Sequence, residues 1–473
     1  METNNSLDPV TDPTPPQKDP ECTVTDMDLS ASPILDPTAA GTKDSTDQAQ
    51  QSYSFYRYDW TDTNHTCLAS TQTRYNLTID ESAALDRPLN ASSQHSTTRT
   101  TDTNNFFKSC QWSPDGTCLL TNSEDRIIRV FDIPSSIYDP SCTPSLDLVP
   151  SLCIQEGESI CDLAWFPSMN SQDPSTCCFL SSVRDHPVRL WDATTGKVRA
   201  SYCVVNHREQ FIGPNVLKFN LDGTKIYCGY ENMIEIFHVH APGNNTSTKI
   251  STTPNRKSRK GQKGIVSCLD FNPDQSGMYA AGSYSNSIGI YDERTDELCL
   301  KLTGMKGNGI TQVKFSLDGH LLYSASRQSN SILCWDVRQS GNILYDLHRK
   351  GKTNQRITFD LDPTGSVLIT GEQDGSVLTY DTTTMETEDV ETKPRLLSSW
   401  QAHQDIVSGA TFNPLYPSVM ASCSGQRKFT ADLSSDDDTS HSTDIIDNSL
   451  KVWQLPGQYE WYSMESQAMD ITA

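Results

Sequence analysis

The sequence has no long hydrophobic run and no secretory leader. No uninterrupted apolar stretch reaches the length of about 18 residues that a membrane-spanning helix needs, and residues 1–20 carry neither a positive segment nor an apolar core. The 15 cysteines are scattered along the chain and lack the C-x-x-C spacing of a zinc site. We therefore expect a protein that is neither membrane-bound nor secreted, with reduced cysteines and no metal ion.

Recognisable catalytic motifs are also missing. The sequence has no nucleophile elbow, no H-E-x-x-H zinc motif and no dinucleotide fingerprint. Gly351-Lys352-Thr353 resembles the end of a phosphate-binding loop, but the glycine required five positions before Gly351 is replaced by Asp346. We predict that the protein is not an enzyme and takes no cofactor or small-molecule substrate.

Positive charge is scarce over the chain as a whole. Lys and Arg number 37 against 60 Asp and Glu, a formal net charge of -23, whereas a nucleic-acid binder needs cations to meet the phosphates. Part of the imbalance lies in residues 1–50, where Asp, Pro, Thr and Ser predominate and too few apolar residues occur to form a core. We predict a disordered acidic tail there, so the remaining charge has to be followed along the chain.

One strand pattern returns seven times after Phe106. Each copy holds an apolar alternating run, a turn rich in Pro, Asp and Gly, a second apolar run, and an alternating strand that ends in an aromatic residue followed, in most copies, by Asp. These last strands read IIRVFD (127–132), PVRLWD (187–192), MIEIFH (233–238), SIGIYD (287–292), SILCWD (331–336), SVLTYD (376–381) and SLKVWQ (449–454). Repeats with a base period of about 40–45 residues are typical of WD proteins. We predict an all-β fold, a seven-bladed WD-repeat β-propeller.

The repeats also predict where the propeller begins, ends and closes. No convincing strand motif follows Trp453, so the outer strand of the last blade must come from another part of the chain. The aromatic-rich segment 53–70 is our candidate for that strand. The predicted order is an acidic tail, a linker with the closing strand, the propeller with three insertions, and a C-terminal tail, over residues 1–50, 51–105, 106–456 (insertions near 241–262, 382–398 and 428–447) and 457–473.

Four residues of the last repeat match a structural hydrogen-bonded group of WD blades. His403 lies in the loop before the blade, Ser422 on the second strand, Asp447 in the following turn and Trp453 on the third strand. We interpret His403 as a structural residue of this group in preference to a catalytic or metal-binding one.

The charges of the repeats separate onto two faces, because a propeller sends alternate loops to opposite ends of its axis. The turns between first and second strands collect Asp115, Asp173, Asp222, Asp274, Asp318 and Asp362. The opposite loops collect most of the Arg and Lys residues, with some acidic ones among them. We predict a basic platform there, fit for phosphates. For the basic run 254–263, a solvated loop or a nuclear-import patch remains the alternative.

Several segments resemble one family closely. FFKSCQWSPDGTCLLTNSEDRIIRVFDIP (106–134), CWDVRQSG (334–341), TNQRITFDLDPTG (353–365) and ASCSGQR (421–427) are similar to the telomerase Cajal body protein family of WD-repeat proteins. The resemblance implies a nuclear scaffold of the Cajal body. Such a scaffold binds the localisation box of H/ACA-type small Cajal body RNA and of telomerase RNA, with H/ACA ribonucleoprotein and telomerase components as partners.

The resemblance and the charge pattern together select candidate RNA-binding residues. They are Arg184, His186, Arg208, Arg256, Lys257, Arg259, Lys260, Arg327, Asn354, Gln355, Arg356, Gln426 and Arg427. Blade-to-blade packing is the alternative role for the two loops 353–356 and 424–427. We expect Arg338, on the opposite face, to form a salt bridge between blades. The alternative function is a protein-only WD-repeat scaffold that binds acidic or phosphorylated peptides.

Overall fold

The structure is a computed structural model that describes one compact unit, Tyr53–Tyr462, with several gaps. The described residues are 53–61, 65–71, 105–138, 146–205, 209–243, 247–255, 257–258, 260–305, 307–339, 341–388, 391–427 and 447–462. The predicted acidic tail and nearly all of the predicted insertion 428–447 lie outside them. Within the described part, no helix combines the length and the hydropathy of a membrane span.

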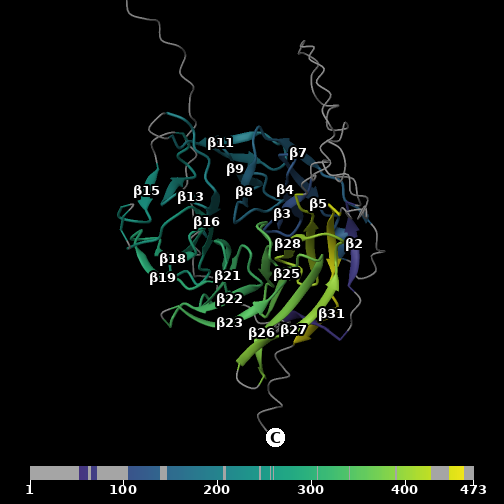
Figure 1. Ribbon diagram of the computed structural model, residues 1–473. Coiled ribbons are helices and arrows are strands. Elements are labelled where there is room, and N and C mark those ends of the chain that lie inside the picture. Colours follow the sequence, from purple (N-terminus) through teal and green to yellow (C-terminus); the bar gives the residue numbers. More distant parts are fainter. Residues whose placement is uncertain are drawn as a thin grey trace, which may run out of the picture. The chain divides into compact units, whose positions relative to one another are not determined.

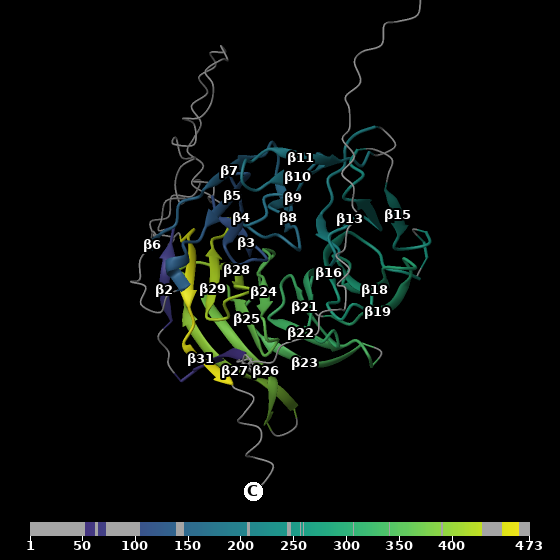
Figure 2. The same ribbon diagram turned by 180° about the vertical axis from the view of Figure 1, so that it is seen from behind.

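Seven antiparallel sheets surround one axis, as Figures 1 and 2 show, and this confirms the predicted seven-bladed propeller. In each blade the chain runs from the inner strand outwards. Blade 1 has β3 (Phe107–Trp112), β4 (Cys118–Ser123), β5 (Ile127–Asp132) and β7 (Leu152–Gln155); blade 2 has β8 (Ile160–Trp165), β9 (Cys178–Val183), β10 (Val188–Asp192) and β11 (Val198–Tyr202); blade 3 has β12 (Val216–Phe219), β13 (Lys225–Tyr230), β14 (Met233–His238) and β15 (Thr248–Ser251). Short polar turns within each blade let sequential strands pair directly.

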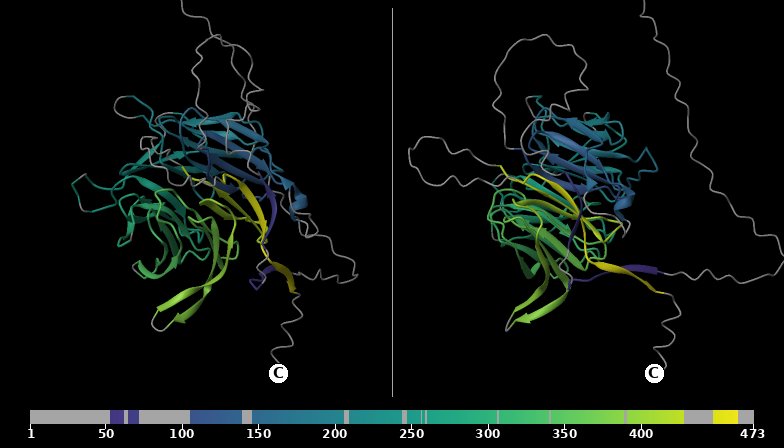
Figure 3. Two further views of the ribbon diagram at one scale, coloured as in Figure 1. Left: turned by 45° about the vertical axis from the view of Figure 1, so that its right-hand side comes forward. Right: turned by 90° about the vertical axis from the view of Figure 1, so that its right-hand side faces the viewer.

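Blades 4 to 6 repeat this arrangement. Blade 4 has β16 (Val266–Phe271), β17 (Met278–Ser283), β18 (Ser287–Asp292) and β19 (Leu298–Leu302); blade 5 has β20 (Ile310–Phe315), β21 (Leu321–Ser326), β22 (Ser331–Asp336) and β23 (Asn342–His348); blade 6 has β24 (Phe359–Leu361), β25 (Val367–Gly371), β26 (Ser376–Glu388) and β27 (Glu391–Gln401). The long pair β26–β27 takes up most of the predicted insertion 382–398 and projects beyond its sheet in both views of Figure 3.

The seventh blade takes its outer strand from the beginning of the described chain. Its three repeat-derived strands are β28 (Val407–Phe412), β29 (Val419–Ser424) and β30 (Leu450–Gln454). The fourth is β2 (Thr66–Ser70), antiparallel to β30 with Cys67 opposite Trp453. This strand lies inside the segment 53–70, and a fifth short strand, β6 (Leu146–Asp147), runs parallel to it. The ring is thus closed by hydrogen bonds between strands far apart in the chain.

The structure differs from the predicted boundary at residue 456. Residues 457–462, assigned to a C-terminal tail, form β31 (Gly457–Tyr462), which pairs with β1 (Tyr53–Tyr58). The paired strands come from opposite ends of the unit, so the repeat pattern contains no copy from which either could be recognised. The Tyr56 hydroxyl donates to the Leu455 carbonyl over 2.8 Å and ties this ribbon to the seventh blade.

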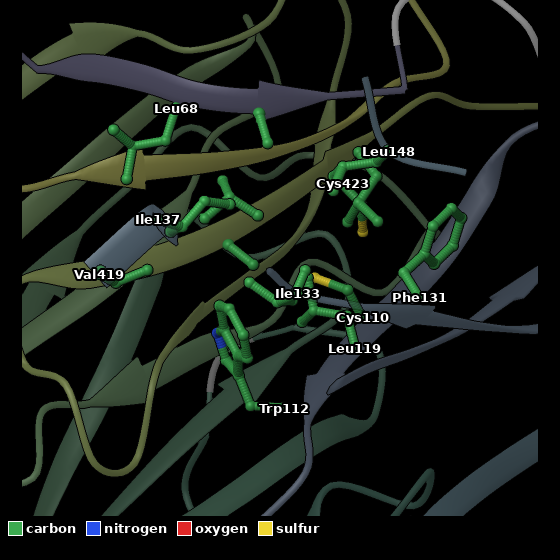
Figure 4. Close-up of a cluster of buried hydrophobic side chains, with 14 of the residues drawn as sticks. Leu68, Cys110, Trp112, Leu119, Phe131, Ile133, Ile137, Leu148, Val419 and Cys423 are labelled. Atoms are coloured by element: carbon green, nitrogen blue, oxygen red, sulfur yellow. The ribbon is translucent and has the colours of Figure 1, made fainter. Parts of the chain in front are cut away.

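Apolar side chains between neighbouring sheets form the core. Figure 4 shows the cluster where the seventh blade, the closing strand and the first blade meet, with Leu68, Trp112, Phe131 and Val419 among its members. Strands in the middle of a blade are buried on both faces, as in β9, where all six residues are buried. Each fully buried side chain of Leu size contributes roughly 1.5–3 kcal/mol. The closing strand therefore adds packing as well as hydrogen bonds.

The propeller has two chemically different ends. We call turn face the end that carries the turns between the first and second strands of each blade, and loop face the end that carries the loops between second and third strands and between blades. The two faces are joined by the channel that runs between the inner strands, lined in part by Lys108 to Trp112 and Ala410 to Phe412. The candidate site lies where this channel opens on the loop face.

Candidate nucleic-acid interface

Polar side chains connect the inner strands of neighbouring blades around a channel of about 1270 Å³. Neighbouring inner strands belong to different sheets, so their backbone groups need other partners. The Asp162 carboxylate accepts from the Leu217 amide of the next blade over 3.1 Å. Asp360 does the same for the Phe412 amide over 3.0 Å. These carboxylates are therefore part of the closed ring and are explained by its structure.

The cations halfway along the channel are already neutralised by carboxylates. The Lys218 ammonium lies 3.3 Å from the Asp270 carboxylate of the next blade, and Lys314 pairs in the same way with Asp360. Paired charges in a narrow space leave little net field for a polyanion. Any anionic partner must therefore be held at an opening of the channel and not in its middle.

At the loop face, a triad of charges lies on the rim of the channel. The Lys108 ammonium lies 2.7 Å from one oxygen of the Glu124 carboxylate, and Arg427 pairs with the other oxygen. Burial lowers the pKa of Lys108 to about 8, and the neighbouring Arg427 adds to this effect. Two cations share one carboxylate here, so the triad carries a net positive charge when Lys108 is protonated.

Arg356 points into the channel. Its guanidinium donates to the Ser267 carbonyl of blade 4 over 3.1 Å and lies 4.0 Å from the Asp162 carboxylate of blade 2. The residue itself belongs to the loop that enters blade 6. Arg356 therefore connects three blades across the opening, and its role is to hold the rim together as well as to supply charge.

Amide side chains fix the loops beside Arg356. The Gln355 amide donates to the Gly425 carbonyl over 2.7 Å, and the Gln426 amide donates to the Asp405 carboxylate over 2.6 Å. Asn354 is exposed, and its amide oxygen accepts from Gln328 over 2.9 Å. These bonds hold the loops 353–356 and 424–427 in one arrangement on the rim.

An aromatic residue and an arginine are stacked on the same rim. The guanidinium carbon of Arg327 lies 3.8 Å from the centre of the Tyr284 ring, and both residues line the channel and are partly exposed. Within the described residues, the buried Nε atom of Arg327 has no hydrogen-bond partner. A flat aromatic ring beside a guanidinium is the combination on which unpaired bases stack.

The structure brings six of the thirteen candidate residues together at the loop-face opening. They are Arg327, Asn354, Gln355, Arg356, Gln426 and Arg427. Four others, Arg184, His186, Lys257 and Lys260, lie in described loops and do not line the channel. Arg208, Arg256 and Arg259 lie outside the described residues. The candidate site is thus more compact than the predicted platform.

Two members of the rim, Lys108 and Tyr284, were missed by sequence reasoning, and Glu124 was expected on this face only as one of the acidic residues among the cations. Glu124 and Tyr284 directly follow the second strand of their blades, as Arg327 does in blade 5. The position directly after the second strand of a blade is therefore the signal by which Glu124 and Tyr284 could have been predicted. Lys108 stands near the beginning of an inner strand whose alternation indicates only that one face is buried.

The predicted structural group of the last blade is present. Trp453 Nε1 donates to the Ser422 hydroxyl over 2.8 Å, and that hydroxyl lies 2.7 Å from His403 Nε2. His403 Nδ1 lies 3.5 Å from the Asp447 carboxylate. Burial lowers the pKa of His403 below its usual value, although Asp447 opposes this. His403 is therefore enclosed in the blade, and its burial favours the neutral form.

Other blades place different polar residues where the seventh has His403. Glu156 accepts from the Ser181 hydroxyl over 3.2 Å, and Ser181 in turn accepts from Trp191 over 2.8 Å. Arg349 donates to the Thr370 hydroxyl over 3.1 Å, and burial lowers its pKa to about 10. A search for histidine alone therefore finds one of several equivalent structural groups.

Arg338 does not join two blades, so this expectation is wrong. Its guanidinium lies 3.2 Å from the Asp336 carboxylate, two residues earlier at the end of its own strand β22. The side chain is 57% exposed. The close spacing within one turn makes the local pair easier to form than a pair across the gap between blades.

Among the described residues, no three His, Cys, Asp or Glu side chains are grouped to hold a metal ion.

Comparison with known proteins identifies relatives of this chain. The family described as WD domain, G-beta repeat matches residues 95–132 and 254–292, and the family described as Lactonase, 7-bladed beta-propeller matches residues 284–396, less than half of the chain. Telomerase Cajal body protein 1 of Homo sapiens is 38% identical over 339 residues, 72% of this chain and 60% of that protein. The same protein of Bos taurus is 37% identical over 364 residues, 76% of this chain and 66% of that protein. The chain belongs to the telomerase Cajal body protein family.

A fungal relative matches over more of its own length. The Guanine nucleotide-binding protein negative regulator 1 of Schizosaccharomyces pombe is 32% identical over 361 residues, 74% of this chain and 88% of that protein. By contrast, the chain spans less than two thirds of the length of the human and bovine members of the telomerase Cajal body protein family. The resemblance that the sequence motifs indicated is thereby confirmed at the level of the family.

Proposed function

We propose that this member of the telomerase Cajal body protein family is a non-catalytic RNA-binding scaffold. Its loop-face rim, formed by Lys108, Tyr284, Arg327, Asn354 and Arg427, would recognise the localisation box of H/ACA-type small Cajal body RNA and of telomerase RNA. The observation that carries the proposal is the stack of Arg327 on the partly exposed Tyr284 beside a cationic triad. Unpaired loop bases are the part of RNA that such side chains read.

In this proposal the rim residues have different tasks, each supported by the position of its side chain. Tyr284 offers a ring face to a base, and Arg427, whose side chain is 55% exposed, offers a guanidinium to a phosphate. Asn354 is exposed and its amide can reach a base edge. Arg356 is turned inwards and acts as a positioning residue, because its guanidinium is held by Ser267 and Asp162.

The names of the relatives support the setting that we propose for this activity. The human and bovine proteins are named for telomerase and for the Cajal body. We infer a nuclear protein that accompanies its RNA to Cajal bodies, with H/ACA ribonucleoprotein and telomerase components as partners. Its cargo is RNA in this proposal, and a catalytic role has no part in it.

A filter-binding experiment tests the proposal. The probe is a small H/ACA-type hairpin that carries the localisation box, and the variants are Tyr284→Ala and Arg427→Ala. Loss of one stacked base or one phosphate contact should weaken binding by roughly tenfold, and Arg427→Ala should also reduce the dependence of log K on log salt by about one. Arg338→Ala, an exposed arginine on the turn face, is the matched control and should bind as the wild type does.

The same experiment distinguishes the RNA-binding function from the alternative function. A protein-only scaffold would bind acidic or phosphorylated peptides and would be indifferent to the hairpin. Equal hairpin binding by the wild type and both rim variants, without dependence on salt, would contradict the RNA proposal.

A further inference from the structure

The opposite, turn face carries a ring of apolar residues at one equivalent position. In all seven blades the second residue after the inner strand is proline or leucine: Pro114, Pro167, Leu221, Pro273, Leu317, Pro363 and Pro414. Every member is partly or fully exposed, and Pro114, Pro167, Leu221 and Pro414 also line the channel. The ring therefore surrounds the channel opening at the end opposite to the RNA-binding rim.

Turn chemistry explains the prolines of this ring but not the leucines. Proline suits such a position because its fixed φ matches the turn. Leucine has no such conformational advantage, yet Leu221 and Leu317 are 47% and 49% exposed. In blade 7, Leu415 follows the proline and is 58% exposed. Three large apolar side chains thus stand exposed in one ring of turns, in blades 3, 5 and 7.

Neighbouring turns are in contact, so the ring is continuous over several blades. Gly365, with a φ of +76°, would place a Cβ atom 3.4 Å from Leu317 of the preceding blade. Gly319, with a φ of +72°, would place one only 2.8 Å from Asp274 of the blade before it. A side chain at Gly319 would be strained and would collide with the neighbouring turn. Glycine thus lets adjacent turns meet edge to edge around the opening.

Exposed carboxylates follow the apolar residues directly. Asp222, Asp274 and Asp318 are exposed, and each accepts a backbone hydrogen bond from the residue two positions later. The hydrogen bonds from Thr224 lower the pKa of Asp222 below its usual value. Asp222 therefore carries its negative charge at neutral pH.

Three cations near the apolar ring of the turn face are already paired with carboxylates. The Lys225 ammonium lies 3.3 Å from Glu293, and the Arg199 guanidinium lies 3.0 Å from Asp192. Arg338 is paired with Asp336, as described above. Each of these three cations thus has a carboxylate partner of its own, and among the described residues no salt bridge involves Asp222, Asp274 or Asp318. Like charge disfavours nucleic acid and anionic lipid at such a surface.

We propose that the turn-face ring, formed by Leu221, Leu317, Leu415 and the carboxylates of Asp222, Asp274 and Asp318, binds a basic amphipathic segment of a partner protein. The leucines receive the apolar side of that segment, and the carboxylates meet its Lys and Arg residues. This site goes beyond the RNA-binding function and shares no residue with it. The propeller then holds RNA at one end and a protein at the other.

Fluorescence anisotropy with the full chain tests this site. The probe is a labelled helical peptide of leucine and lysine, about 18 residues or five turns long. A control peptide has glutamate in place of each lysine. The triple variant L221S, L317S and L415S should bind the lysine peptide roughly tenfold more weakly. The matched control is the triple variant V198S, I343S and L344S, which alters leucine-like residues of similar exposure on the outer strands and should bind within about twofold of the wild type.

A second variant keeps the turns intact. D222N, D274N and D318N retain side-chain oxygens for the turn hydrogen bonds, so the fold is preserved while the charge is removed. These substitutions should weaken binding of the lysine peptide and reduce its salt dependence. Equal loss in the outer-strand control, equal binding of the glutamate peptide, or no binding of the lysine peptide would overturn the proposal. RNA binding by all of these variants should stay unchanged, so the two sites fail or succeed separately.

Discussion

At the scale of single residues, the loop-face rim combines charges that are held by partners with groups that are open to a ligand. Glu124 is shared between Lys108 and Arg427, and Asp162 lies close to Arg356. A phosphate that approaches the rim must compete with these carboxylates, which favours a defined RNA loop over any polyanion. The Tyr284 ring is stacked against Arg327.

If the rim binds RNA as proposed, Lys108 should make that binding depend on pH. Its pKa of about 8 lies within the range of ordinary buffers, so its charge is present at pH 7 and is lost as the pH rises to 9. The affinity of the wild type for the hairpin should fall by roughly threefold to tenfold over this interval, because one cation near the phosphates disappears. Filter binding at pH 7, 8 and 9 measures this change.

Lys108→Arg is the control for this pH effect. Arginine keeps its charge at pH 9, so the fall should vanish in this variant. A fall of the same size in wild type and variant would show that another group titrates.

Residue roles were harder to predict than residue locations. The loops 353–356 and 424–427 were expected on the basic face, and the structure places both at the channel opening. That Arg356 turns inwards could not be predicted, because its partners Ser267 and Asp162 belong to other blades. Side-chain direction in a loop depends on such distant contacts, which a single sequence does not contain.

At the scale of elements, closure depends on β2. Leu68 on this strand is 1% exposed and belongs to the cluster shared by the seventh and first blades. The strand also contributes backbone hydrogen bonds along β30. Because both ends of the ring meet here, damage to β2 should affect the stability of the whole propeller.

Leu68→Ala should lower the free energy of unfolding by about 2–4 kcal/mol, since it leaves a cavity in a packed cluster. Chemical denaturation followed by intrinsic fluorescence measures this loss. Val198→Ala is the control, because Val198 also lies on an outer strand but is 45% exposed. If both substitutions cost the same, β2 is not the strand that closes the ring.

The regular elements were predictable and the irregular ones were not. The period of the repeats located the seven third strands, because each ends in the same aromatic pattern. The pairing of β1 with β31 has no counterpart in the repeat, so residues 457–462 were assigned to a tail. The extension of β26 and β27 was interpreted as an insertion, since the WD pattern itself stops at Asp381.

At the scale of the whole molecule, the fold separates two kinds of surface. The net charge of -23 describes neither end of the channel, because the turn face carries exposed carboxylates and the loop face carries the arginines of the rim. Our proposals give the two ends different ligands, RNA at one and a basic protein segment at the other. Such a molecule would act by bringing its two ligands together.

The central claim is that RNA binds over the loop-face opening of the channel, and photochemical crosslinking tests it most directly. A hairpin with 4-thiouridine in its unpaired localisation box would be crosslinked to the full chain, and the attached peptides identified by mass spectrometry. We expect crosslinks on the peptides that contain Tyr284, Asn354 and Arg427, reduced in Tyr284→Ala. Crosslinks confined to the turn face, or spread evenly over the surface, would contradict the account.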